Sequence, residues 1–227
     1  MASGWTKLAP MRLIHYYHIF ADGRWHMLAN QHFMALGNYG LGNALHEIRI
    51  GIVGQPQNRK EVKAFLAQVL PAGRYQVVTE RTTAWEQATL NEMHKASLEE
   101  LDAIYIYAHT KGGADASLIN QLWCRSMTFF CVVAWQQVLE RIKDADIAGP
   151  HWITKEKWPH MADHNNPHGY PYFGGNFWWA KATHIAKLGA PERDHRWQAE
   201  HWIGKAEARP VDLCPGWPSP ELFVITW

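Results

Sequence analysis

The run DAIYIYAHTKGG, residues 102–113, decides the fold class of this 227-residue chain. Its first seven residues, Asp102–Ala108, form the most apolar of the strands that we expect in the first half of the sequence. The polar and glycine-rich loop 109–113 follows at once. Ligands of parallel α/β sheets bind beyond the carboxyl ends of the strands, so this loop is a candidate binding segment.

Three more strands precede this one, and each is followed by a helix. Strands are expected where β-branched and aromatic residues gather between turns, and helices where apolar residues recur at helical spacing. These criteria predict strands at 12–20, 46–54 and 75–79 and helices at 25–36, 58–70 and 85–98, with Asn58 as a helix N-cap. The alternation predicts an α/β fold with a mostly parallel central sheet flanked by helices.

The second half of the sequence has a different character. It predicts one long helix, a brief strand and two short helices, at 118–143, 147–150, 182–188 and 194–203. Between them, His160, His164 and His168 recur every four residues around Asp163, a spacing that on a helix could hold zinc. Flanking prolines and asparagines favour a loop instead, and we expect this loop to form a mobile flap over the ligand-binding site.

The composition limits the classes of function. The charges nearly cancel, with 22 Lys and Arg against 21 Asp and Glu. The composition therefore lacks the excess of basic residues that is expected of a protein that binds nucleic acid mainly through its phosphates. Three cysteines suggest no disulfide framework, and Cys124 and Cys131 are expected in the core. No apolar window of 18 residues and no leader is present. We expect a soluble, cytoplasmic protein, in the host cell if the chain is viral.

A second distinctive stretch is YFGGNFWWAK, residues 172–181. Adjacent glycines, an amide and two indoles suit a sugar, which offers C–H patches to aromatic rings and hydroxyls to the amide. The alternative is a buried aromatic strand whose glycines mark a bulge. Because neighbouring side chains of a strand point to opposite faces, one of Trp178 and Trp179 is expected in the core.

Several motifs together resemble one protein family. These are His109-Thr110-Lys111-Gly112, Trp123 and Arg125, the FGGNFWWA run, the run AEHWIG at 199–204, and Trp-Glu-x-x-Thr-Leu at 85–90. The set looks like a family of small glycosyltransferase-like proteins of bacteria, phages and large viruses. The resemblance covers about 14–204 and implies a GT-A-like fold. We expect one domain over 1–227, with a nucleotide-binding half at about 12–113 and an acceptor and sugar half at 114–227.

The resemblance further implies transfer of a glycosyl group from a nucleotide-sugar, such as a UDP-sugar, to an acceptor hydroxyl in a hexosyltransferase-like reaction. Many such enzymes hold a divalent cation with Asp-x-Asp after the fourth strand. This chain has His-Thr-Lys-Gly there, so Lys111 can supply the positive charge, and dependence on Mn²⁺ or Mg²⁺ stays open. The acceptor is a glycan, a protein or a modified DNA base.

The candidate donor-binding residues lie in the strand-end loops and the second distinctive stretch. They are His18, Phe20, Asp22, Gly54, Arg59, His109, Thr110, Lys111, Gly112, Gly174, Gly175, Asn176 and Trp178. Turn formation explains Asp22 equally well, and His109 equally suits a packed strand cap. Arg59 lies at a helix start, where the free N–H groups favour an anion.

An inverting transfer also needs a base on the acceptor hydroxyl. Glu200 and Asp194 are the candidates, and Lys111 is expected to stabilise the departing diphosphate. The alternatives are an ion-pair stripe with Arg196 for Glu200 and a helix cap for Asp194. Two rival functions are an inactive carbohydrate- or nucleotide-sugar-binding protein of the same fold and a nucleotide-sugar hydrolase.

Overall fold

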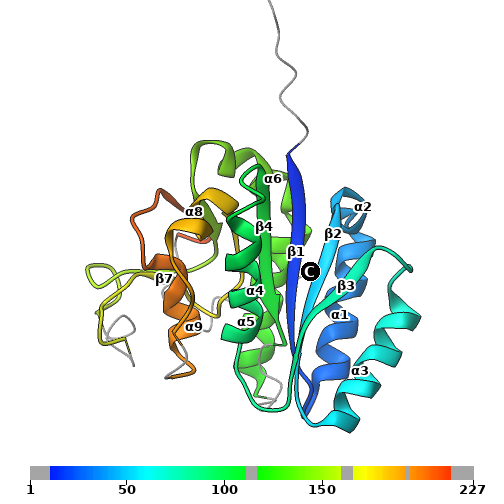
Figure 1. Cartoon of the computed structure of the whole chain (residues 1–227). Coiled ribbons are helices and arrows are strands. Elements are labelled where there is room, and N and C mark those ends of the chain that lie inside the picture. The colour runs from blue at the N-terminus through cyan, green and yellow to red at the C-terminus, as the bar shows by residue number, and fades with distance from the viewer. Residues whose placement is uncertain (1–10, 111–116, 160–165, 193–194, 216–227) are drawn as a thin grey trace, which may run out of the picture.

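The structure is a computed structural model, which describes residues 11–110, 117–159, 166–192 and 195–215. A seven-stranded sheet forms its centre, in the order β3-β2-β1-β4-β8-β5-β9. Figure 1 labels strands β1 to β4 of this sheet. The strands are β1 (Arg12–Phe20), β2 (Glu47–Val53), β3 (Tyr75–Arg81), β4 (Ala103–His109), β5 (Ile147–Gly149), β8 (Trp178–Lys181) and β9 (Pro210–Asp212). All neighbours are parallel except β8, which is antiparallel to both β4 and β5.

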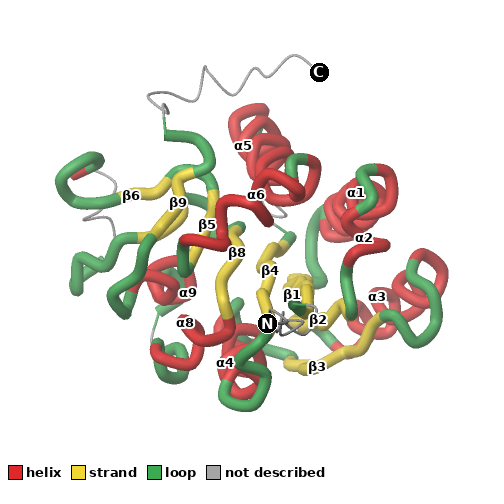
Figure 2. The backbone as a smooth tube through the Cα atoms, turned by 90° about the horizontal axis from the view of Figure 1, so that it is seen from above, coloured by secondary structure: helices red, strands yellow, loops and turns green. Residues whose placement is uncertain are grey.

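Helices cover both faces of the sheet, as the view from above shows (Figure 2). One layer holds α1 (Trp25–Asn38), α2 (Leu41–Ala44), α3 (Pro56–Val69), α5 (Leu118–Thr128) and α6 (Trp135–Arg141). The other holds α4 (Gln87–Ser97), α8 (Ala182–Lys187) and α9 (Gln198–His201). The expected α/β class, a mostly parallel sheet flanked by helices, is confirmed.

The two helical layers explain why β4 is so apolar. Ile104, Ile106 and Ala108 pack into the core on the α1 side, whereas Tyr105 and Tyr107 pack into the core on the α4 side. A strand in the middle of such a sheet is buried on both faces, so it reads as a continuous apolar run. Strand β8 follows the same rule with larger side chains.

Trp178 and Trp179 lie on opposite faces of β8, and both are fully buried. One of them was expected in the core, and the structure places both there. Their neighbours β6 (Trp152–Ile153) and β7 (Tyr172–Phe173) form a separate two-stranded sheet.

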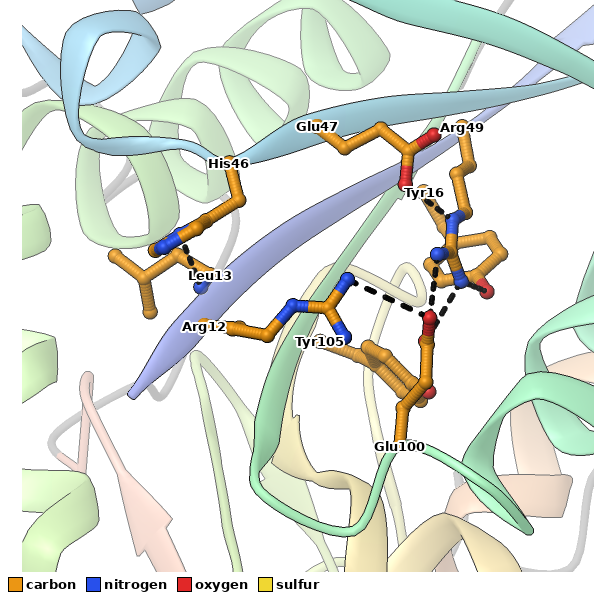
Figure 3. A network of polar contacts seen from close by, with 8 residues as sticks. All are labelled: Arg12, Leu13, Tyr16, His46, Glu47, Arg49, Glu100 and Tyr105. Carbon is orange, nitrogen blue, oxygen red and sulfur yellow. Dashed lines mark hydrogen bonds and ion pairs between the residues drawn. The ribbon is translucent and has the colours of Figure 1, made fainter. Parts of the chain in front are cut away.

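A network of charged side chains holds the amino-terminal half of the sheet together (Figure 3). Arg49 of β2 donates to both carboxylate oxygens of Glu100, at 2.6 and 2.8 Å, and to the Tyr16 hydroxyl at 2.7 Å. Tyr105 donates to Glu100 at 2.9 Å, and Glu47 accepts from Arg49 at 2.8 Å. The network therefore links β1, β2, β4 and the turn before β4.

Two predictions about helices are wrong. The helix expected at 118–143 is interrupted by a π-helix, Phe129–Val133, and ends in the 3₁₀ turn Ile142–Asp144. Asn58 is not an N-cap, because Gln55 caps α3 and Pro56 begins it, where its missing N–H costs nothing. The Asn58 amide instead donates to the Ala21 carbonyl at 2.7 Å and ties α3 to the end of β1.

Two expectations from composition can be compared with the structure. Cys124 and Cys131 are free thiols: Cys131 is buried, and Cys124 is only partly buried. Among the described residues, no helix is both long enough and apolar enough to span a bilayer.

Candidate functional site

A cleft of about 610 Å³ opens beyond the carboxyl ends of β1, β2 and β3. Phe20 ends β1 and Asp22 follows it, Gly54 follows β2, and Arg81 ends β3. The first turns of α3 and α4 close its sides. Parallel sheets gather their loops at this edge, so the cleft lies where α/β proteins bind ligands.

The walls of the cleft combine aromatic rings with polar groups. Phe20 and Trp85 are 44% and 46% exposed, so both rings are accessible to a ligand in the cleft. Asp22 is exposed, and its carboxylate also accepts from the Gly23 N–H at 2.7 Å, as expected for a turn. Arg81 supplies a cation. Flat rings, a carboxylate and a guanidinium suit a ligand with a base, a ribose and a phosphate.

Gln87 adds a buried acceptor to this cleft. Its side chain is 2% exposed, and its amide N–H group donates to the His195 carbonyl at 2.8 Å. Its carbonyl oxygen has no hydrogen-bond partner among the described parts of the chain. A buried acceptor without a partner costs free energy, and a ligand N–H or O–H would satisfy it.

Glu86 is the centre of a second polar cluster beside the cleft. One carboxylate oxygen accepts from the Tyr107 hydroxyl at 2.9 Å and from the Asn176 amide at 2.7 Å. The other lies 3.4 Å from His109 Nδ1. His109 Nε2 in turn donates to the Gly175 carbonyl at 3.1 Å. The end of β4 and the segment 172–181 therefore meet through Glu86.

Glu86 was missed as a site residue by the sequence analysis. Glu86 is part of the Trp-Glu-x-x-Thr-Leu motif, but nothing in the motif distinguishes a site residue from an ordinary glutamate exposed to solvent. The same motif supplies Trp85 to the cleft wall and Thr89 to a buried contact with His18. Trp85 and Glu86 just before α4 and Thr89 in its first turn thus connect the cleft to the sheet, which is the signal that could have singled out Glu86.

The segment 172–181 lies in the interior, with every residue from Tyr172 to Ala180 buried. A Cβ on Gly175 would clash with Met127 Sδ, and one on Gly174 would lie 2.9 Å from Ile153 Cδ1. The glycines therefore permit close packing against protein. The expectation that they admit a ligand is corrected by this geometry, and the alternative of a buried aromatic strand describes the segment better.

Asn176 and Trp178 bond to each other within this segment. Asn176 has a left-handed backbone, with φ of 59°, and its side-chain oxygen accepts from the Trp178 indole at 2.7 Å. Both side chains have no exposed surface. As placed here they hold Glu86 in position, and neither presents a surface to a ligand.

His18 and Thr110 tie strand ends together. His18 is 2% exposed, shares a 2.7 Å hydrogen bond with Thr89, and has its pKa lowered to about 4 by burial. Thr110 accepts from the Phe20 N–H at 3.0 Å and donates its own N–H to His18. These contacts fix the loop geometry at the carboxyl edge and leave His18 in the core.

The basic residues of this edge have distinct surroundings. Arg59 lies 3.6 Å from Glu80 in an ion pair and keeps a buried Nε without a partner in the described chain. Arg81, which the sequence analysis did not select, lines the cleft. Lys111, Gly112 and Asp194 lie outside the described residues, so their predicted roles remain predictions.

Glu200 lies on α9 and is 9% exposed. Burial, followed by the charge of Glu200, raises the pKa of Tyr172. Burial, followed by the charge and the hydrogen bond of Glu86 and the charge of Glu200, raises the pKa of Tyr107. The charge of Glu200 thus influences Tyr107, the tyrosine that donates to Glu86. The role of Glu200 as a base stays a prediction. Arg196, its expected ion-pair partner, lies with its guanidinium 4.5 Å from the Trp197 ring centre.

The described residues contain no group of three or more His, Cys, Asp or Glu side chains that could hold a metal ion. His168 stacks on Tyr170, with ring centres 5.2 Å apart. The other members of the expected zinc set, His160, Asp163 and His164, lie outside the described residues, as does the segment directly after Thr110.

No protein-family model matches the sequence. No curated protein matches it either. Among solved structures, the chain is similar to the 4-diphosphocytidyl-2C-methyl-D-erythritol synthase of Anaerococcus prevotii, with a TM-score of 0.46 and 10% identity over 88% of each chain. A likeness this distant carries no argument about what the chain binds or catalyses.

Proposed function

We propose that this protein is a glycosyltransferase that binds a nucleotide-activated sugar, such as a UDP-sugar, in the strand-end cleft. The cleft itself is the observation that supports this most, because it combines the ligand-binding edge of a parallel sheet with exposed aromatic rings and a buried free acceptor. The base would lie against Phe20 and Trp85, and its N–H groups would reach Gln87. The ribose hydroxyls would donate to Asp22.

The diphosphate would then extend toward the end of β4. The next residue after Thr110 is Lys111, whose ammonium would stabilise the departing nucleoside diphosphate. A base on the acceptor hydroxyl completes the displacement, and Glu200 is the candidate that the structure describes. No step in this scheme depends on a metal, and manganese is tested as a variable.

Glu86 acts in this proposal as a positioning residue. It bonds the end of β4, through Tyr107 and His109, to the turn at Asn176. Lys111 is two residues beyond His109 in the sequence. Holding His109 in place would therefore fix the point from which the chain continues toward Lys111.

The first experiment is a calorimetric titration with uridine, cytidine, guanosine and adenosine diphosphates. A ligand that binds only the folded state also raises the melting temperature by mass action. Trp85→Ala should weaken binding by about tenfold or more, because stacking on one base contributes roughly 1–3 kcal/mol. Leu98→Ala is the matched control, since Leu98 is 57% exposed, directly follows α4 and does not line the cleft. Failure of all four nucleotides to bind would contradict the proposal.

The second experiment separates the rival functions. The protein is incubated with the nucleotide-sugar of the preferred base and mixed acceptors, with and without manganese. Glycosylated acceptor supports a transferase, whereas free sugar as the final product identifies a hydrolase. Tight binding without turnover in any acceptor mixture identifies a binding protein that has lost the chemistry.

A further inference from the structure

A second cavity, of about 280 Å³, is lined by residues of α1 and α5. These helices lie on the sheet face opposite α4 (Figure 2). Tyr17 of β1, His109 at the end of β4 and Phe177 just before β8 line it, together with side chains of both helices and of the π-helix Phe129–Val133. Its volume lies just below the usual range of ligand cavities, which suits an occupant the size of one sugar unit. The π-helix is a second sign of a site, because such bulges are frequent where proteins bind ligands.

The charge of this cavity is one-sided. Arg24 and Arg125 both line it, and no described lining residue is an aspartate or glutamate. Arg24 makes only a 3.6 Å contact with Met27 Sδ, and neither guanidinium has a carboxylate partner among the residues that the structure describes. Two guanidiniums at one cavity without a counter-charge favour an anionic ligand, and carboxylates suit the planar guanidinium well.

A chain of two histidines gives the cavity a hydrogen-bond acceptor. His15 Nδ1 lies 3.1 Å from the Ile106 carbonyl, which can only accept, so this nitrogen carries the proton. Burial lowers the pKa of His15 to about 4, so the ring is neutral and its Nε2 is an acceptor. His32 Nε2, 2.8 Å away, must then be the donor.

His32 is consequently an acceptor at its other nitrogen. Burial, with smaller effects of His15 and His109, lowers the pKa of His32 well below its usual value and keeps the ring neutral. Its Nδ1 has no hydrogen-bond partner within the described chain, although His32 lines the cavity. The ring is held flat against Tyr17, with centres 4.4 Å apart. The lone pair of Nδ1 therefore has a fixed direction and suits a hydroxyl donor.

We propose that this cavity is a second ligand site, for a small hydroxy acid of the size of one acidic sugar. Its carboxylate would lie between Arg24 and Arg125, and one hydroxyl would donate to His32 Nδ1. The proposal rests on this cavity alone and stands apart from the proposed transferase activity.

The test is a calorimetric titration of the full chain with glucuronate, glucose and inorganic phosphate as probes. Glucuronate should bind with a dissociation constant of about 1 mM, as expected for a ligand of this size, and at least about tenfold more tightly than glucose. Arg24→Gln and Arg125→Gln should each weaken glucuronate binding by about tenfold or more, because each removes a charged hydrogen bond. Arg141→Gln removes the same charge from the neighbouring helix α6, outside the cavity, and should change nothing.

His32→Phe tests the hydroxyl contact. The ring can still stack on Tyr17, so glucuronate should bind about tenfold more weakly while phosphate binding stays the same. Equal binding of glucose and glucuronate overturns the proposal, as does unchanged glucuronate binding in Arg125→Gln. If phosphate binds as tightly as glucuronate, the site recognises negative charge alone, and this result also overturns the proposal. Arg125 is exposed, so its variant decides the matter even if His32→Phe fails to fold.

Discussion

Glu86 shows how one residue can organise a site without lining its cleft. Its carboxylate joins Tyr107 and His109 of β4 to Asn176, so it connects two segments that are far apart in the sequence. Glu86→Ala leaves two buried donors without an acceptor and should lower the free energy of unfolding by about 2–3 kcal/mol. Urea denaturation measures this. Glu92→Ala in α4 removes an ion pair with the exposed Lys95 and a 3.4 Å hydrogen bond from Asn91, and a loss as large there would deny Glu86 any special role.

Arg49 makes a comparable case at the opposite end of the sheet. Arg49→Ala leaves Glu100 without its main partner and should cost about 3 kcal/mol, the low end for a buried pair, since the Glu100 side chain is 17% exposed. Arg209→Ala is the control, because that guanidinium pairs with Asp146 while its side chain is 69% exposed. Its loss should be below about 1 kcal/mol. Equal losses by denaturation would mean that the network of Figure 3 adds nothing.

At the scale of elements, local pattern predicted most of the sheet. Strand β1 has the expected bounds, and β2, β3 and β4 differ by two residues or fewer, because each reads as an apolar run between turns. The break at Phe129 could not be predicted, since the flanking apolar spacing is that of a continuous helix. The buried position of the segment 172–181 was also out of reach, because its packing partner Met127 is distant in the sequence.

Two glycines, Gly51 and Gly37, allow the effect of packing on stability to be distinguished from the effect of backbone freedom. A Cβ on Gly51 of β2 would clash with the Thr89 hydroxyl and lie 2.9 Å from Thr89 Cβ, while His18 holds Thr89 in place. Gly51→Ala should therefore lower stability by about 1–3 kcal/mol. Gly37→Ala in α1 meets no atom within 4 Å and should raise stability by up to about 1 kcal/mol through helix propensity. Calorimetric melting of both variants checks the signs, and a stable Gly51→Ala would contradict the close crossing of α4 over β2.

For the whole molecule, buried histidines set the response to acid. Burial lowers the pKa values of His15, His18 and His151 to about 4, from an ordinary value of 6.5. The unfolded chain then binds more protons than the folded one between these values, so stability is full above pH 6.5 and falls as the pH drops toward 4. The slope is roughly 1.4 kcal/mol per pH unit for each histidine. Urea midpoints across this range measure it, and His18→Gln should reduce the slope by one histidine's share.

The antiparallel strand β8 has a consequence for how the chain is made. It covers the edge of β4 with residues 178–181, which leave the ribosome long after 103–109. Until then, a nascent chain that has already ordered β3, β2, β1 and β4 presents an open row of backbone donors and acceptors. Fragments ending near residue 144 should self-associate for this reason, and a synthetic peptide that spans 172–181 should suppress that association by occupying the vacant edge.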